Sequence, residues 1–143
     1  MRLWDYRLLP YLDDFHIIAQ WRELLAIKGA IDKNGTPNHR LVNKVLDYNI
    51  KDFKNYTTLV AMELMSRDIK FLYSKYEEIL HWDSQHFNNN RDCDCIPYHD
   101  WHNNRYLTQN YYNLEEKMDC GIVSKQAWKR IDEFYKRFIE NKV

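Results

Sequence analysis

The chain has 143 residues, of which 45% are hydrophobic and 29% are charged, a composition typical of one globular domain with a sizeable core. Three glycines and three prolines are too few for a turn-rich β architecture. The net charge is zero, so any basic surface that binds nucleic acid must be local. We find no apolar run long enough to span a membrane, no leader sequence and too few cysteines for a disulfide scaffold, and therefore expect a cytoplasmic protein.

The first twelve residues are expected to form a short arm, in which Pro10 prevents an early helix. The helix that organises the chain is predicted over residues 13–29. Asp13 or Asp14 supplies its N-cap, and Gly29 supplies a left-handed stop. Residues spaced three and four positions apart form one broad apolar face on this helix. They are Ile17, Ile18, Trp21, Leu24, Leu25 and Lys28.

A loop is predicted from Gly29 to Pro37, because Asp32-Lys33-Asn34-Gly35 is a strong turn signal. The pair Thr36-Pro37 resembles an N-cap followed by proline at the first helical position, so we expect a short helix to begin there. The apolar residues of this helix are Leu41, Val42, Val45 and Leu46. Its exposed side carries the best candidate for a basic patch, formed by His39, Arg40 and Lys44.

Two further helices are predicted in the middle of the chain. The first begins at Asp52 or Asn55 and ends near Arg67, where the apolar phase shifts. The second spans residues 72–82, and a single long bent helix is the alternative. The composition of residues 88–92 indicates a loop.

Helical spacing resumes over residues 100–119 and ends at Gly121. Ser124 then caps a last helix, whose buried stripe is formed by Trp128, Ile131, Tyr135 and Phe138. No segment alternates convincingly in the manner of a strand. We therefore predict an all-α fold, a compact single-domain bundle of five or six helices over residues 1–143.

One constellation in the first quarter of the chain suggests chemistry. Arg22 and Glu23 are adjacent on the organising helix, and His16 lies a little under two turns before them. A helical arginine–glutamate pair is usually a solvated surface feature. Here, however, the sequence becomes apolar at Leu3, so the terminus at Met1 is expected to be docked. A docked α-amine has an intrinsic pKa of about 7.7–8 and is a candidate nucleophile.

Three motifs, Met1-Arg2-Leu3-Trp4, His16 and Trp21-Arg22-Glu23-Leu24, together resemble the pyrimidine dimer DNA glycosylase family, also called endonuclease V. The resemblance extends more faintly to Thr57–Phe71, to Ile96-Pro97 and to Leu114-Glu115-Glu116-Lys117. It implies a DNA repair glycosylase with associated AP lyase activity, acting on pyrimidine dimers or other modified pyrimidines in duplex DNA. The resemblance also implies a Schiff base on the N-terminal amine, and hence no cofactor.

The family's chemistry assigns a role to each matching residue. Met1 would supply the nucleophilic amine, and Glu23 would stabilise positive charge at the sugar carbon and then move a proton. Arg2 and Arg22 would hold the phosphates that flank the lesion, and His16 would hydrogen-bond the sugar or a phosphate. The patch containing Arg40 and Lys44 would add further DNA contacts. The expected partner is double-stranded DNA with a damaged base, and a monomer is the expected state.

Cys93, Cys95, His99 and His102 could suggest a zinc site. The single residue between the two cysteines is tighter than zinc sites usually have, so we predict no metal.

Two other readings place different demands on the surface. A non-catalytic module of the same fold would grip nucleic acid or a protein through Arg2, Arg22 and Arg40. A helical interaction protein would instead use its many aromatic residues as a homodimer face. Among these aromatics, Tyr112 beside Arg105 could stack on an unpaired base, although helical spacing favours core positions for most of them.

Overall fold

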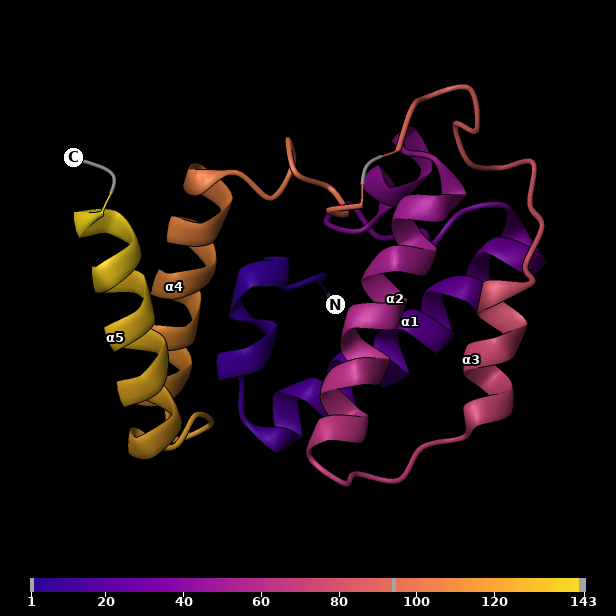
Figure 1. Cartoon of the computed structure of the whole chain (residues 1–143). Helices are drawn as coiled ribbons and strands as arrows, with labels where there is room; N and C mark the ends of the chain where they lie inside the picture. The colour runs from indigo at the N-terminus through magenta and orange to yellow at the C-terminus, as the bar shows by residue number, and fades with distance from the viewer. Residues whose placement is uncertain (1, 94, 142–143) are drawn as a thin grey trace.

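The computed structural model describes residues 2–93 and 95–141. Within these residues the chain forms five α-helices and two short 3-10 helices, with no strand, which confirms the all-α prediction (Figure 1). No helix in the described part of the chain combines the length and the apolar character needed to cross a membrane. In chain order the elements are η1 (Tyr6–Tyr11), α1 (Asp14–Asn34), η2 (Asn43–Asp47), α2 (Ile50–Ser66), α3 (Tyr73–Leu80), α4 (Asn104–Asp119) and α5 (Lys125–Glu140).

The long helix α1 begins as predicted but ends later. The Asp13 carboxylate caps it by accepting a hydrogen bond of 2.9 Å from the backbone nitrogen of His16. The predicted stop at Gly29 is wrong, because the helix continues until Gly35 ends it in the left-handed conformation with φ 77°. A Cβ atom at Gly35 would lie 3.0 Å from the His86 ring, whereas Gly29 has no such neighbour within 4 Å. Gly35 is therefore the glycine whose backbone conformation the helix end requires.

Two predictions that rest on proline are also wrong. Pro10 lies inside η1 rather than preventing a helix, because its fixed φ near −65° falls within the 3-10 range. Thr36 does not cap a helix that starts at Pro37. Its hydroxyl accepts a hydrogen bond of 3.1 Å from the nitrogen of Asn38 and donates one of 3.3 Å to the side chain of Asn43. This local turn delays the helix, which forms as the 3-10 helix η2.

The remaining helices follow the sequence pattern with shifted starts. Asn49 caps α2, so this helix begins earlier than Asp52. α2 and α3 are separate helices, so the alternative of one long bent helix is wrong. Asn103 caps α4, which begins after residue 100 because residues 98–102 form turns. Ser124 caps α5 by accepting a hydrogen bond from the nitrogen of Ala127, as predicted.

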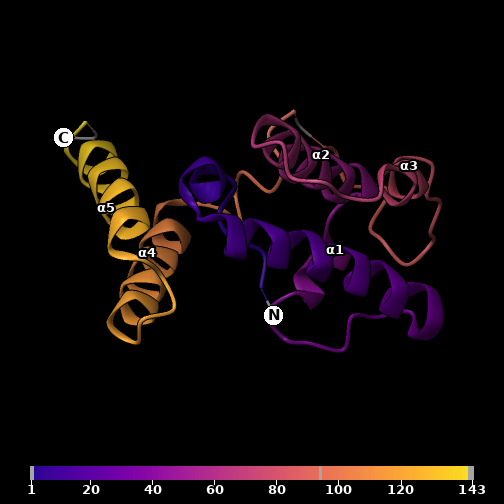
Figure 2. The same cartoon turned by 90° about the horizontal axis from the view of Figure 1, so that it is seen from below.

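The N-terminal residues lie in the middle of the protein. In Figures 1 and 2, η1 lies between the α1–α2 pair and the α4–α5 hairpin, while α3 packs on the far side of α2. The side chains of Leu3, Leu8, Leu9 and Leu12 are all less than 3% exposed, and Tyr11 stacks on Phe134 of α5. Residues 2–12 therefore join the two groups of helices through buried apolar contacts, which fix this segment relative to α1.

Candidate active site

Residues 2–6, here called the N-terminal segment, are held against α1 by two neighbouring side chains. The backbone nitrogen of Arg2 donates a hydrogen bond of 3.3 Å to Oε2 of Glu23. Gln20 donates from Nε2 to the carbonyl oxygen of Arg2 at 3.0 Å, and its Oε1 accepts from the nitrogen of Trp4 at 2.9 Å. Nε2 of Gln20 also lies 3.4 Å from Oε2 of Glu23. One glutamine thus connects the start of the chain to the carboxylate of Glu23.

Side chains from other elements complete the hold on the N-terminal segment. Tyr56 of α2 donates to the carbonyl oxygen of Trp4 at 2.6 Å, and Tyr106 of α4 donates to that of Leu3. Asn110 of α4 accepts from the nitrogen of Asp5 at 2.8 Å. Because extended backbone carries unpaired polar groups, this succession of partners fixes both its position and its direction.

The last of these partners is His102, whose Nδ1 accepts from the nitrogen of Tyr6 at 3.1 Å. This bond requires the proton of the neutral ring to be on Nε2, and Nε2 is buried without a described hydrogen-bond partner. Burial, together with the positive charge of Arg7, lowers the pKa of His102 to about 3. His102 is therefore a neutral structural acceptor in the folded protein at physiological pH.

Glu23 lines an open pocket of about 380 Å³ that also includes Arg2, His16 and His39. His16 is 5% exposed, and its Nδ1 donates to Asp13 at 2.6 Å. The residue that caps α1 therefore also orients the His16 ring. Three residues selected from the sequence, Arg2, His16 and Glu23, come together around this pocket.

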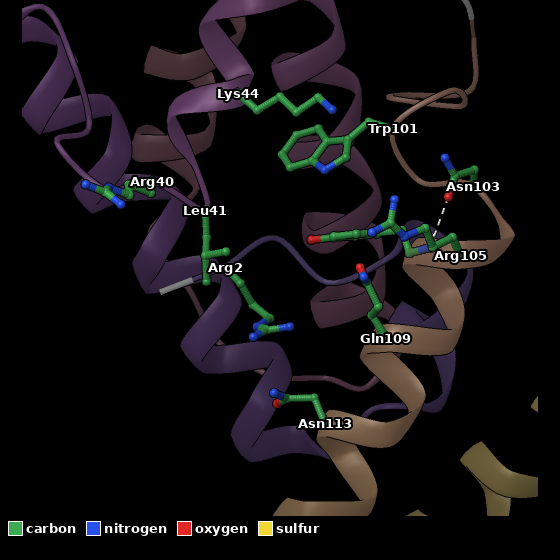
Figure 3. Close-up of a pocket in the computed structure, with 10 residues that line it drawn as sticks. Arg2, Arg40, Leu41, Lys44, Trp101, Asn103, Arg105, Gln109 and Asn113 are labelled. Atoms are coloured by element: carbon green, nitrogen blue, oxygen red, sulfur yellow. Dashed lines mark hydrogen bonds between the residues drawn. The ribbon is translucent and has the colours of Figure 1, made fainter.

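A second pocket, of about 520 Å³, adjoins the first and is basic. Figure 3 shows Arg2 near its centre, Arg40 and Lys44 on one side, and Arg105 from α4 on the other. No carboxylate is among its lining residues. Because Arg2 lines both pockets, the basic surface continues to the carboxylate of Glu23.

The cations of the basic pocket differ from other arginines in their partners. Arg7, Arg67 and Arg91 each form an ion pair with aspartate or glutamate. Arg2 instead lies over the Trp4 ring, with its Cζ 5.2 Å from the ring centroid, and Nζ of Lys44 lies 5.8 Å from that of Trp101. The basic pocket has four cations, Arg2, Arg40, Lys44 and Arg105. None of them forms an ion pair with another described residue. Their positive charge is therefore available to an anionic ligand.

Two other residues predicted from the sequence, Arg22 and Tyr112, line neither the Glu23 pocket nor the basic pocket. Arg22 is exposed and lines a separate hollow of about 440 Å³ that shares Glu23 and Phe15 with the first pocket. Tyr112 is 58% exposed and lines neither pocket beside Arg2. Met1 lies outside the described residues, so the structure does not test its assignment as nucleophile.

The described residues of the cluster Cys93, Cys95, His99 and His102 are not gathered into a metal site. Within residues 2–93 and 95–141, no group of three or more metal-ligand side chains gathers to hold an ion. His102 instead uses Nδ1 to accept the backbone hydrogen bond from Tyr6. None of the three cysteines forms a disulfide.

Arg105 and Trp101 also line the basic pocket, but the sequence did not predict this position for them. They belong to α4 and to the turn before it, about 60 residues after Lys44. The sequence singled out Arg105 only as a neighbour of Tyr112, and nothing in it indicates that Arg105 and Trp101 lie beside Arg40 and Lys44. They reach the basic pocket because Tyr106 and Asn110, on the neighbouring face of α4, bind the N-terminal segment.

Comparison with known proteins gives one match. The family model described as pyrimidine dimer DNA glycosylase matches residues 1–77, more than half of the 143 residues. The match includes Arg2, His16, Arg22, Glu23 and the 40–44 part of the basic pocket, and it ends before α4. Searches among curated proteins and among solved structures give no match.

Proposed function

Because the chain belongs to the pyrimidine dimer DNA glycosylase family, we propose that it excises damaged pyrimidines from duplex DNA and then cleaves the abasic strand. The observation that carries this proposal is the 3.3 Å hydrogen bond from the Arg2 nitrogen to Glu23, on the wall of an open pocket. Three covalent bonds separate the α-nitrogen of Met1 from the nitrogen of Arg2, which limits their separation to about 4 Å. An amine there can reach a sugar held beside Glu23.

The proposed reaction begins with attack of the neutral α-amine of Met1 on C1′ of the damaged nucleotide. The bond between C1′ and the base breaks, and the base leaves with the electron pair and gains a proton. Opening of the sugar ring transfers a proton to O4′ and leaves an imine between the protein and C1′. Glu23 stabilises the positive charge near C1′ during the first stage.

The imine then permits strand cleavage. It acidifies the hydrogen on C2′, and in this proposal the Glu23 carboxylate accepts that proton as a general base. The electrons of the C2′–H bond form the new double bond, and the 3′ phosphate leaves with the electrons of its bond to C3′. Hydrolysis of the imine finally releases the protein. No metal or organic cofactor takes part in these steps.

The cations hold the strand during both stages. Arg2, Arg40, Lys44 and Arg105 line one basic pocket without competing carboxylates, and guanidinium groups bind phosphate oxygens through paired hydrogen bonds. We assign Arg22 to a phosphate at the separate hollow that it lines with Glu23, and His16 to a sugar or a phosphate in the pocket that it shares with Glu23 and Arg2. Damaged pyrimidines stack poorly, so extruding a nucleotide toward the pocket costs less there than at intact pairs.

Borohydride trapping tests the proposal. Reduction of the imine joins the protein to a duplex that contains an abasic site, and the adduct is measured by gel and intact mass. We expect an adduct with the unmodified protein and its loss after acetylation of the α-amine. With a duplex that contains a pyrimidine dimer, where base release must precede the imine, the adduct should also be lost in Glu23→Gln. Glu116→Gln, at an exposed glutamate of α4, is the matched control and should retain the adduct.

The same experiment separates the non-catalytic reading from the enzyme. A binding module would bind the duplex with steep salt dependence and give no adduct, and its binding would be indifferent to Glu23. Absence of any adduct with abasic duplex, when binding is demonstrated in parallel, would refute the lyase reaction.

A further inference from the structure

Phe15 is a large apolar side chain in an unusual position. It is the second residue of α1, its side chain is 65% exposed, and it lines both hollows that contain Glu23. Single exposed apolar residues are common on protein surfaces. The informative feature is therefore that this phenyl ring lies beside the proposed catalytic carboxylate and the Arg2 cation.

The geometry of α1 relates Phe15 to Glu23. Phe15, Ala19 and Glu23 are spaced four residues apart, so all three lie along one face of the helix. Eight residues correspond to about 12 Å along the axis. The small side chain of Ala19 leaves space between the ring and the carboxylate, and Ala19 lines both hollows as well.

The Phe15 ring is supported on one side. It meets the ring of His16 edge-on, with 5.3 Å between the ring centroids, and His16 is fixed in turn by its hydrogen bond to Asp13. The ring is thus held by a buried neighbour while most of its surface faces solvent.

A second exposed apolar residue flanks the same pocket. Leu41 is 53% exposed and lines both the Glu23 pocket and the basic pocket. Other exposed apolar side chains, such as Met62 and Tyr73, line none of these pockets. An occupant of the Glu23 pocket must therefore offer apolar faces to Phe15 and Leu41 and negative charge to the nearby cations, and a stack of bases between phosphate backbones meets both demands.

We propose that Phe15 inserts beside the lesion and stacks on a base next to the damaged nucleotide, while Leu41, which lines the same pocket, contacts the same strand. This inference rests on the proposed function. Proteins that distort DNA use apolar side chains as wedges between base steps, and a ring that covers an unpaired base offsets the stacking lost when a nucleotide is extruded. The wedge favours damaged steps because their own stacking is weak.

Binding to a duplex with a stable abasic analogue tests the wedge without chemistry. Phe15→Ala removes the ring from an exposed site and should leave the melting temperature nearly unchanged. Since stacking on one base contributes about 1–3 kcal/mol, the dissociation constant should rise about 5- to 150-fold. Phe15→Trp should restore binding, and Tyr73→Ala, at an exposed aromatic residue of α3, should leave it unchanged.

Fluorescence locates the insertion. We would place 2-aminopurine, whose emission rises when it loses its stacking neighbours, immediately 5′ or 3′ of the abasic analogue in separate duplexes. At saturating protein, at least one position should change its emission with the unmodified chain and with Tyr73→Ala, and this change should disappear with Phe15→Ala.

The outcomes distinguish the wedge from the enzyme reaction. If the unmodified protein gives no borohydride adduct, the proposed function fails. If the adduct forms but Phe15→Ala matches the unmodified protein in affinity and in 2-aminopurine emission, the wedge is refuted while the enzyme proposal stands.

Discussion

Gln20 offers the sharpest test of how the protein positions its own first residues. Its carboxamide binds the nitrogen of Trp4, the carbonyl oxygen of Arg2 and the carboxylate of Glu23, and its Oε1 also accepts a hydrogen bond of 3.0 Å from the hydroxyl of Tyr56. Gln20→Leu keeps a side chain of similar size but removes all four contacts. The nitrogen of Trp4 is then buried without a partner, which costs about 1–3 kcal/mol of unfolding free energy. The carbonyl of Arg2 is partly accessible and can recover a water molecule.

The effect on reaction rate should exceed the effect on stability. A reacting group displaced by about 1 Å can lose about 100-fold in rate, so we expect single-turnover borohydride trapping by Gln20→Leu to slow by about that factor. Ile31→Val is the matched control, because it lies at the far end of the same helix, is fully buried and should cost about 0.5–1.5 kcal/mol. Urea denaturation measures both stabilities.

Equal trapping rates for these two variants, at protein concentrations where both are folded, would refute the positioning role. A slow rate in Gln20→Leu that recovers when the DNA concentration is raised would also contradict it, because that result indicates weakened binding rather than a misplaced amine.

Three further predictions concern stability and binding. Gly35→Ala should lower the unfolding free energy by at least about 1–2 kcal/mol, because the φ angle of Gly35 is 77°. Gly29→Ala, inside α1, should raise the unfolding free energy by about 0.5–1 kcal/mol. Thermal melts check both variants. The pKa of His102 is about 3 in the folded protein and about 6.5 in the unfolded chain. The unfolded chain therefore takes up a proton first as the pH drops below 6.5, which lowers the unfolding free energy by about 2 kcal/mol at pH 5. Urea titrations at pH 7 and pH 5 should show this contribution, and it should be absent in His102→Gln. Arg105→Ala should reduce the slope of log affinity against log salt by about 1, and Arg137→Ala on α5 should not, as measured by anisotropy from 50 to 200 mM salt.

Local sequence signals predicted the helices well because helix ends depend on neighbouring residues. The caps at Asp13 and Ser124 required only a side chain and an amide three residues away. The errors at Gly29 and Pro10 have a different cause. Glycine and proline are each compatible with more than one local backbone structure, so the neighbouring residues alone do not decide which one forms.

The candidate site was partly predictable for the same reason. His16, Arg22 and Glu23 are on one helix, so their proximity follows from helical geometry. Leu3, from which the docking of the terminus was inferred, is fully buried, and the docking of Met1 itself stays a prediction. Arg105 joins the basic pocket through contacts between α4 and the N-terminal segment, about 100 residues apart in the sequence. A single sequence carries no signal for such contacts.

Peptide mapping of the borohydride-trapped adduct tests the central claim most directly. After nuclease and protease digestion, tandem mass spectrometry identifies the residue that carries the reduced sugar remnant. We predict that the remnant is on the α-nitrogen of Met1, in the N-terminal peptide. A remnant on a lysine side chain, with the N-terminal peptide unmodified, would contradict the account.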